Sequence, residues 1–230
     1  MAKVYIDAGH GGSSVGATYK GRKEQDDCLR LALAVGKLVA AQGIEVKYSR
    51  TTDVNPDLTG RCKDANTWGA DYFISIHRNA FKPEQAQGVE AYVYSKCKVG
   101  GATYNKAKVI VGEVCAATGF DNRGVKLGAP GYTDFAVNRV TNMDSCLLEC
   151  GFIDSTADNK IFDDRFSSLA LAIAKGLCAA VGVDYKVIES KPPEKVKYYV
   201  QVGAFSDKAN AENFVKTLKK DGYDAIIKEM

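Results

Sequence analysis

Apolar residues recur along most of the chain in short continuous runs that alternate with helical stripes. The runs over 4–7, 44–49, 71–77 and 145–152 predict strands, and the last two are apolar enough to be buried on both faces. Stripes at three- and four-residue spacing predict helices over 28–39, 58–68, 107–114 and 169–180. Segment 89–94 alternates apolar and polar residues, which predicts a more exposed strand. We therefore expect an α/β fold with a mostly parallel twisted central sheet flanked by helices.

The character of the sequence changes after residue 184. Segment 185–197 is charged and contains two adjacent prolines, which is typical of an extended linker. Beyond it, "YYVQVGAFS" and "YDAIIKE" predict strands on either side of a short helical stripe. The predicted organisation is a main domain over 1–184, a linker over 185–197 and a small C-terminal β-α-β unit over 198–230. Such a short unit builds a poor core alone, so it is either half of a larger module or pairs with another copy.

Composition excludes several classes of protein. The 31 basic and 28 acidic residues leave a net charge of +3, too balanced for a nucleic-acid-binding surface. No stretch of about 18 apolar residues predicts a membrane span. The start, "MAKVYIDAGH", lacks the pattern of a secretory signal, so we expect the chain to be made in the cytoplasm. The seven scattered cysteines form no CxxC pair, which favours buried, reduced thiols over disulfides or a cysteine metal site.

Three residues whose side chains can bind a metal or transfer a proton lie at the ends of predicted buried strands. The chain has two histidines: His10 follows the first strand, and His77 ends the strand "DYFISIH". Glu149 lies at the end of "SCLLE". Because ligands gather at the carboxyl ends of strands in open α/β sheets, we expect these three side chains to meet at one rim.

Each of the three residues also has an ordinary interpretation. A histidine after a strand commonly bonds to the backbone, and a glutamate at a strand end commonly pairs with a lysine or arginine. The convergence of all three favours a site, and two imidazoles with carboxylates indicate zinc. The glycines around His10 also suit a phosphate-binding loop, but neither GxxxxGK[ST] nor GxGxxG is present.

A family resemblance extends this interpretation. The motifs "VYIDAGHGG", "SRTTD", "LTGRCKDAN", "ADYFISIHRNA", "GVEAYVY" and "LLECGFI" follow one another over residues 3–183. In this order they resemble the zinc-dependent N-acetylmuramoyl-L-alanine amidases of bacterial autolysins and phage lysins. The resemblance implies that His10, Glu24 and His77 bind one zinc ion and that Glu149 is the catalytic glutamate.

The resemblance also ranks residues that spacing leaves open. Without the resemblance, Glu24 would be interpreted as one of several solvated acids at a helix start, beside Asp26 and Asp27. The resemblance selects Glu24 among them as the metal ligand. Asn79 is expected to face the cleft and orient ligand or substrate. Arg78 stands where the family more usually has a small residue.

Four further polar residues in the matching motifs have expected structural roles. Arg61 and Asn66 are expected to hydrogen-bond and pack a helix rather than take part in catalysis. Arg50 and Asp53 in "SRTTD" predict a turn held by an ion pair or by side-chain caps.

A mechanism follows from the predicted site. Three protein ligands would leave one zinc position open for water, as in catalytic sites. Glu149 would take a proton from that water and pass it to the leaving amine. The resemblance implies the substrate, which is the amide between N-acetylmuramic acid and L-alanine in peptidoglycan. Two alternatives stay open: a zinc carboxypeptidase or other metal amidohydrolase, and a non-catalytic glycan-binding protein. The joint presence of His10, Glu24, His77 and Glu149 argues against the latter.

The C-terminal segment resembles the first half of a SPOR (sporulation-related) repeat, a module that binds denuded glycan strands. The resemblance implies peptidoglycan as the partner, while the composition argues against nucleic acid and membrane insertion. It also leaves room for a homodimer that completes the repeat. We expect the protein to act on the cell wall, after release through a phage-made membrane lesion.

Overall fold

The computed structural model describes residues 1–128, 134–187 and 201–228. It divides the chain into two compact units, 1–188 and 189–230, which are described separately below. Within the described residues, no helix is both long and apolar enough to cross a membrane.

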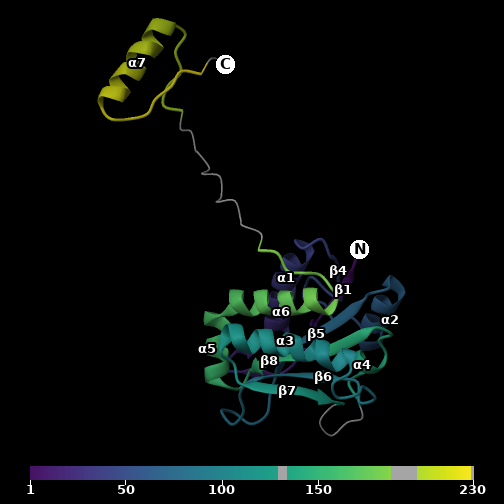
Figure 1. Cartoon of the computed structure of the whole chain (residues 1–230). Coiled ribbons are helices and arrows are strands. Elements are labelled where there is room, and N and C mark those ends of the chain that lie inside the picture. The colour runs from purple at the N-terminus through teal and green to yellow at the C-terminus, as the bar shows by residue number, and fades with distance from the viewer. Residues whose placement is uncertain (129–133, 188–200, 229–230) are drawn as a thin grey trace. The chain divides into compact units, whose positions relative to one another are not determined.

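A six-stranded sheet forms the centre of the first unit (Figure 1). Its strands, in spatial order, are β4 (Glu45–Tyr48), β1 (Lys3–Ala8), β5 (Tyr72–Asn79), β8 (Asp144–Phe152), β6 (Val89–Val93) and β7 (Asn122–Leu127). The first four strands run parallel, β6 runs antiparallel to β8, and β7 runs parallel to β6. The prediction of a mostly parallel sheet in an α/β fold is thus confirmed.

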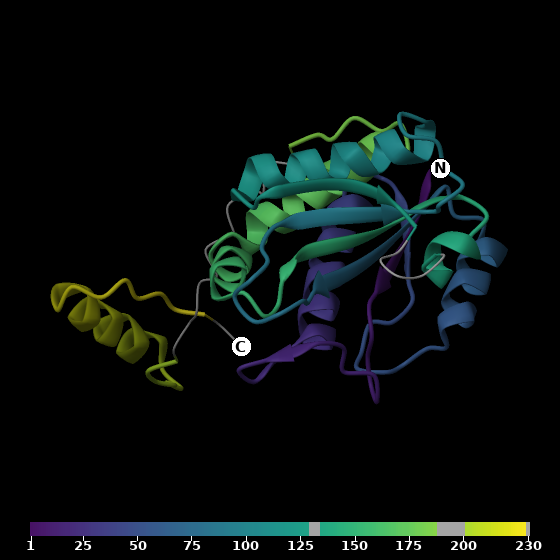
Figure 2. The same cartoon turned by 90° about the horizontal axis from the view of Figure 1, so that it is seen from below.

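Helices cover both faces of this sheet. On one face, α1 (Glu24–Ala40), α3 (Ala102–Thr118) and α6 (Phe166–Ala180) bury the larger apolar core, and α3 and α6 lie side by side (Figures 1 and 2). On the other face, α2 (Leu58–Trp68) and the short α4 (Ala136–Arg139) cover a smaller core around Tyr5 and Phe73. The functional residues described below lie at one end of this second face.

Several connecting elements differ from the sequence predictions. A small hairpin, β2 (Thr18–Tyr19) with β3 (Arg22–Lys23), leads into α1, and α5 (Thr156–Asp164) follows β8. Neither was predicted, and nor was β7, because none of them shows an apolar run. The prediction that 89–94 forms a more exposed strand is wrong. All five residues of β6 are buried, because this strand lies between β8 and β7 in the sheet.

The second unit contains α7 (Lys208–Lys220), and the Asp207 side chain caps its start by accepting from the Asn210 N–H at 3.0 Å. Phe205 packs on Phe214 of this helix. The helix of the predicted β-α-β unit is therefore present. Neither flanking strand is present over 201–206 and 223–228. Residues 198–200 of the first predicted strand and residue 229 of the second lie outside the described range. A strand needs a hydrogen-bonded neighbour, and these segments have none among the described residues.

Candidate metal centre and active-site cleft

His10 lies two residues beyond the end of β1, in a backbone conformation that only a constrained residue adopts. Its φ of 60° falls in the left-handed region, as do those of Gly11 and Gly12 after it. A histidine held in this region costs about 1–3 kcal/mol unless its surroundings enforce the conformation. The Nδ1 atom contacts the Ser14 hydroxyl at 3.1 Å, which leaves Nε2 directed to the cleft side.

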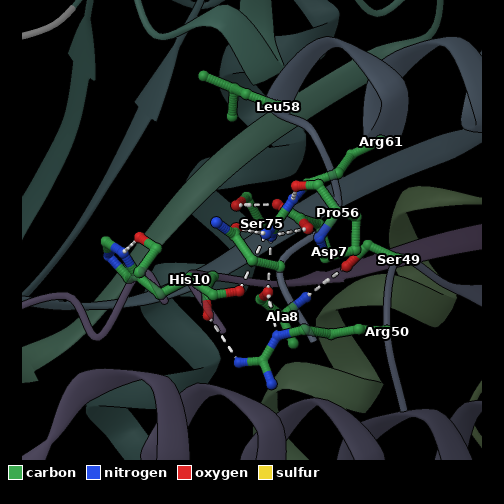
Figure 3. Close-up of polar contacts among 12 residues, drawn as sticks. Asp7, Ala8, His10, Ser49, Arg50, Pro56, Leu58, Arg61 and Ser75 are labelled. Carbon is green, nitrogen blue, oxygen red and sulfur yellow. Dashed lines mark hydrogen bonds and ion pairs between the residues drawn. The ribbon is translucent and has the colours of Figure 1, made fainter. Parts of the chain in front are cut away.

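Two buried arginines enforce the conformation of this loop (Figure 3). Arg61 donates to the Asp7 carboxylate at 2.8 Å, to the Ala8 carbonyl at 2.8 Å and to the His10 carbonyl at 2.9 Å. Arg50 donates to the same Ala8 carbonyl at 3.1 Å and to the Gly9 carbonyl at 2.8 Å. The carbonyls at the end of β1 are therefore fixed from two sides.

These contacts refine the roles predicted for the polar residues of α2 and of "SRTTD". Arg61 forms the expected hydrogen bonds, and Asn66 donates to the Val140 carbonyl at 2.9 Å. Arg50 and Asp53 do not pair with each other in the described contacts. Asp53 instead accepts from the Gly12 N–H at 2.7 Å. Arg50 donates both to the Gly9 carbonyl and, at 3.2 Å, to the Thr52 carbonyl, so it caps its own turn as predicted and also supports the His10 loop.

Glu24, the first residue of α1, places its carboxylate between the two histidines. Oε2 lies 3.1 Å from His10 Nε2, and Oε1 lies 2.9 Å from His77 Nδ1. The backbone N–H groups of Ala17 and Arg78 also donate to this carboxylate, at 2.8 and 3.1 Å. Burial alone would raise the pKa of Glu24, but the hydrogen bonds from His10 and His77 outweigh it and hold the pKa well below its usual range.

His77 points from the end of β5 to the same place as His10 and Glu24. Burial would lower the pKa of His77, but the hydrogen bond to Glu24 and the surrounding negative charges raise it to about 9. The ligand atoms of His10, Glu24 and His77 all lie within 4.8 Å of one another. The structure thus brings these three predicted residues together.

The surroundings of the trio fit a zinc ion. Two imidazole nitrogens and a carboxylate oxygen are the donors that zinc takes in catalytic sites. A side chain at Gly9 would place its Cβ 2.5 Å from the His77 ring, and one at Gly16 would lie 2.5 Å from the Glu24 carboxylate. Both ligands are therefore packed against bare backbone, which prevents them from rotating away and keeps the donor set assembled.

Glu149 lies beside the trio without joining it. It pairs in register with His77 across β5 and β8, and it is 9% exposed. Its Oε2 atom is buried and has no hydrogen-bond partner among the described residues. Burial raises the pKa of Glu149 to about 8, against a smaller opposing influence from His77. A buried carboxyl with a free oxygen next to a donor trio is suited to proton transfer.

These four residues line a cleft of about 370 Å³. Its remaining walls are mostly apolar, and the lining comprises His10, Ala17, Glu24, Leu58, His77, Arg78, Asn79, Ala80, Phe135, Ala136, Val137, Leu147 and Glu149. The cleft is partly open to solvent, so a ligand can enter it.

Arg78 and Asn79 follow His77 and differ in how they face this cleft. The Arg78 guanidinium is buried and binds Asp27 at 2.5 Å and Asn159 at 2.7 Å, with the Phe162 ring 4.2 Å away. It therefore fastens the end of β5 to α1 and α5. Asn79 lines the cleft, but its Nδ2 donates to Glu90 at 2.7 Å and its Oδ1 accepts from the Ala80 N–H at 2.8 Å.

Sequence reasoning missed Glu90 of β6 as part of this region. Its carboxylate is buried and also contacts Arg123 and Lys126 of β7. A buried acid is hard to predict in a strand that alternates apolar and polar residues, because its polar positions are normally assigned to the solvent side. The hydrogen bonds of Arg50 to the carbonyls at the end of β1 were missed for a related reason, because nothing in the sequence shows that an arginine after a short strand is buried.

Comparisons with known proteins agree with this geometry. The sequence model of the N-acetylmuramoyl-L-alanine amidase family matches residues 4–179, and that of the SPOR domain matches residues 194–229. The chain is 37% identical to the sporulation-specific N-acetylmuramoyl-L-alanine amidase of Bacillus subtilis, over 99% of this chain and 84% of that protein. It is 30% identical to the endolysin of Bacillus phage SPP1, over 84% of this chain and 71% of that protein.

Solved structures show the same relationship. The crystal structure of an N-acetylmuramoyl-L-alanine amidase from Clostridium difficile 630 matches with a TM-score of 0.72 and 30% identity, over 79% of this chain and 97% of that one. The catalytic domain of the amidase CwlV from Bacillus (Paenibacillus) polymyxa matches with a TM-score of 0.71 and 30% identity, over 80% of this chain and all of that one.

The fold, the cleft and these relatives define a peptidoglycan hydrolase. Amidases of this kind are generally zinc-dependent, which agrees with the His-Glu-His cluster. The chain belongs to the N-acetylmuramoyl-L-alanine amidase family, and it carries a SPOR domain at its C-terminal end. This confirms the sequence-based interpretation over the carboxypeptidase and non-catalytic alternatives.

Proposed function

We propose that the amidase works with one zinc ion held by His10, Glu24 and His77, and that Glu149 is its general base and acid. The observation that carries this proposal is the position of Glu149. Its buried carboxyl pairs in register with His77, yet its Oε2 has no partner among the described residues. A group in this position can reach a water beside the metal ligands without competing to bind the metal.

The chain's own residues would divide the reaction between them. Bound zinc would supply a Lewis acid for the scissile carbonyl and make the attacking water more acidic. Glu149 would accept the water's proton at Oε2 and deliver it to the nitrogen of the departing L-alanine. Burial raises the pKa of Glu149 to about 8 in the metal-free protein, and the positive charge of a bound zinc ion would lower it, so that the carboxylate is ionised when it acts as base. Asn79, fixed by Glu90 and Ala80, would orient the substrate beside it.

The first test is mass spectrometry of purified peptidoglycan digested by the zinc-loaded protein. We expect free stem peptides that begin with L-alanine, together with intact glycan strands. Zinc-stripped protein should release none, and Glu149→Gln should lose activity by about 100- to 10,000-fold while still binding one zinc ion. Glu113→Gln, an exposed residue of α3, is the matched control.

The results separate the proposal from its alternatives. Cleavage at another peptide bond would place the enzyme among zinc carboxypeptidases. Full activity in Glu149→Gln would remove that residue from the mechanism. Protein that holds zinc but releases no product from several wall types would be a glycan-binding protein.

We further propose that the SPOR domain tethers the amidase to the wall through a linker over 185–197. Tethering raises the local concentration of a catalytic domain at its polymer. Large apolar side chains of this unit are exposed, namely Val202, Phe205, Tyr223 and Ile226. Their exposure supports the predicted pairing with a second copy, which light scattering of the wild type and of Ile226→Lys tests.

The cell wall is the site of action that the amidase relatives support. Those relatives include both a sporulation-specific amidase and a phage endolysin. Release through a phage-made membrane lesion stays a prediction.

A further inference from the structure

A row of functional side chains continues from the metal site across the sheet. His77 of β5 pairs in register with Glu149 of β8, Glu149 pairs with Glu90 of β6, and Glu90 pairs with Gly124 of β7. Residues in register on neighbouring strands project to the same face. This in-register row therefore runs from His77 and Glu149, which line the cleft, past the cleft lining to the edge strand β7.

Glu90 gathers two cations at the far end of this row. Its carboxylate, 2% exposed, accepts from Asn79 at 2.7 Å and Tyr92 at 2.6 Å, and pairs with Arg123 at 2.8 Å and Lys126 at 2.5 Å. One carboxylate thus faces two full positive charges. Because the Arg123 and Lys126 side chains remain 36% and 39% exposed, the excess positive charge is open to solvent.

The space above Gly124, beside these cations, is open. Gly124 and Val125 lie between Arg123 and Lys126 in sequence, and a Cβ built on Gly124 would meet no atom within 4 Å. Arg123 uses Nε on Glu90 and Nη1 on the Gln87 carbonyl, and Nη2 has no acceptor among the described residues. The far end of the row therefore offers room and unused donors for an anion.

The spacing matches a short piece of peptide. Neighbouring strands lie about 4.8 Å apart, so β7 is roughly 10 Å from Glu149. Two extended residues span about 7 Å, and a carboxylate on the second residue reaches somewhat further. A stem peptide cleaved at its first residue beside Glu149 would bring its second residue close to Arg123 and Lys126.

We propose that Arg123 and Lys126 form a specificity subsite for a free carboxylate on the second residue of the stem peptide. This inference rests on the proposed function, because it assumes that the scissile amide lies at Glu149. Glu90 holds Arg123 and Lys126 in place. One positive charge is enough to balance the Glu90 carboxylate, so the other is in excess. The second positive charge is the feature that selects an acidic residue over its amide.

The test compares two defined substrates with the zinc-loaded full chain. Both are muramic acid-containing tetrasaccharides with a dipeptide stem of L-alanine and γ-linked D-glutamate, whose α-carboxylate is either free or converted to a carboxamide. We expect kcat/KM to be about tenfold higher or more for the free acid, the size of a charge-assisted hydrogen bond. Lys126→Gln should bring the ratio of the two kcat/KM values close to one, and Lys126→Arg should retain the preference. Lys108→Gln, an exposed lysine of α3, should match the wild type.

The outcomes are distinguishable. Equal cleavage of both substrates by the wild type would overturn the subsite and leave the amidase mechanism intact. A preference that survives in Lys126→Gln would also overturn it. Failure of the zinc-loaded wild type to cleave either substrate would refute the proposed function itself, and the subsite with it.

Discussion

Arg61 donates from Nη2 to the backbone carbonyl of His10 at 2.9 Å, so a buried guanidinium on α2 fixes a candidate metal ligand through its main chain. The same guanidinium pairs with Asp7, which is 1% exposed and also accepts from the Ser75 hydroxyl at 2.6 Å. The geometry of the metal site is thus joined to a buried ion pair beneath it.

Arg61→Met tests this connection. Removal of one partner leaves the Asp7 charge buried, so we expect the free energy of unfolding to fall by about 3–5 kcal/mol. Because the His10 loop also loses its support, zinc affinity should fall by roughly 10- to 100-fold. Denaturant unfolding and zinc titration measure the two effects. Arg30→Met, at an exposed ion pair, should change stability by less than about 1 kcal/mol. Unchanged zinc affinity in Arg61→Met would contradict the link.

Gly9→Ala should displace the ring of His77, the second histidine of the candidate metal site. The new Cβ would lie 2.5 Å from His77 Cε1 and 2.7 Å from Nε2, so the ring must move. We expect zinc occupancy and amidase activity to fall by at least about tenfold. Gly112→Ala is the matched control, because that helical position has open space around it. There the alanine should stabilise the protein by about 0.5–1 kcal/mol and leave activity unchanged.

Glu149→Gln should alter how the stability of the zinc-free protein depends on pH. The folded pKa of about 8 lies above that of an exposed glutamate, so between roughly pH 5 and 8 the folded state holds a proton that the unfolded state lacks. This group therefore lowers wild-type stability as pH rises through that window. We expect the free energy of unfolding of the variant, relative to that of the wild type, to rise by up to about 1.4 kcal/mol per pH unit in this window. Urea unfolding with chelator present measures this difference. A difference that stays constant from pH 5 to 8 would show that Glu149 is not buried as described.

Removal of residues 189–230 should separate tethering from chemistry. The first unit contains every residue of the candidate site and its own core, so we expect its kcat/KM on soluble muropeptide fragments to match that of the full chain. On insoluble walls the shortened chain should be slower by roughly tenfold or more, because it loses the effective concentration that a second binding module supplies. Equal rates on insoluble walls would argue against tethering.

The sheet, and the candidate site residues that follow its buried strands, were predictable because such strands form continuous apolar runs in the sequence. His10, His77 and Glu149 each end such a run, and the parallel arrangement of β1, β5 and β8 brings them to one rim. Glu24 was not predictable from spacing, because an acid at a helix start is common for electrostatic reasons alone. The family resemblance was needed to choose it.

The remaining differences have physical causes. Glu90 looks solvent-facing in the sequence, yet four donors compensate its burial. Three of them come from distant segments, β5 and β7, and no local pattern records such partners. The edge strand β7 has too few apolar residues to form a run. In the C-terminal unit the β-branched and aromatic residues predict strands, but a strand requires a hydrogen-bonded neighbour, and the described residues 201–228 provide none.

The reversed direction of β6 and β7 has a consequence for how such an enzyme can diversify. The metal ligands and Glu149 come from the ends of strands and the segments after them, whereas Glu90, Arg123 and Gly124 lie at the beginnings of strands. Under the two proposals above, bond breaking and substrate choice would depend on separate stretches of chain. Substitutions in the first residues of β6 and β7 would then change which wall polymer is accepted without altering the metal ligands or Glu149.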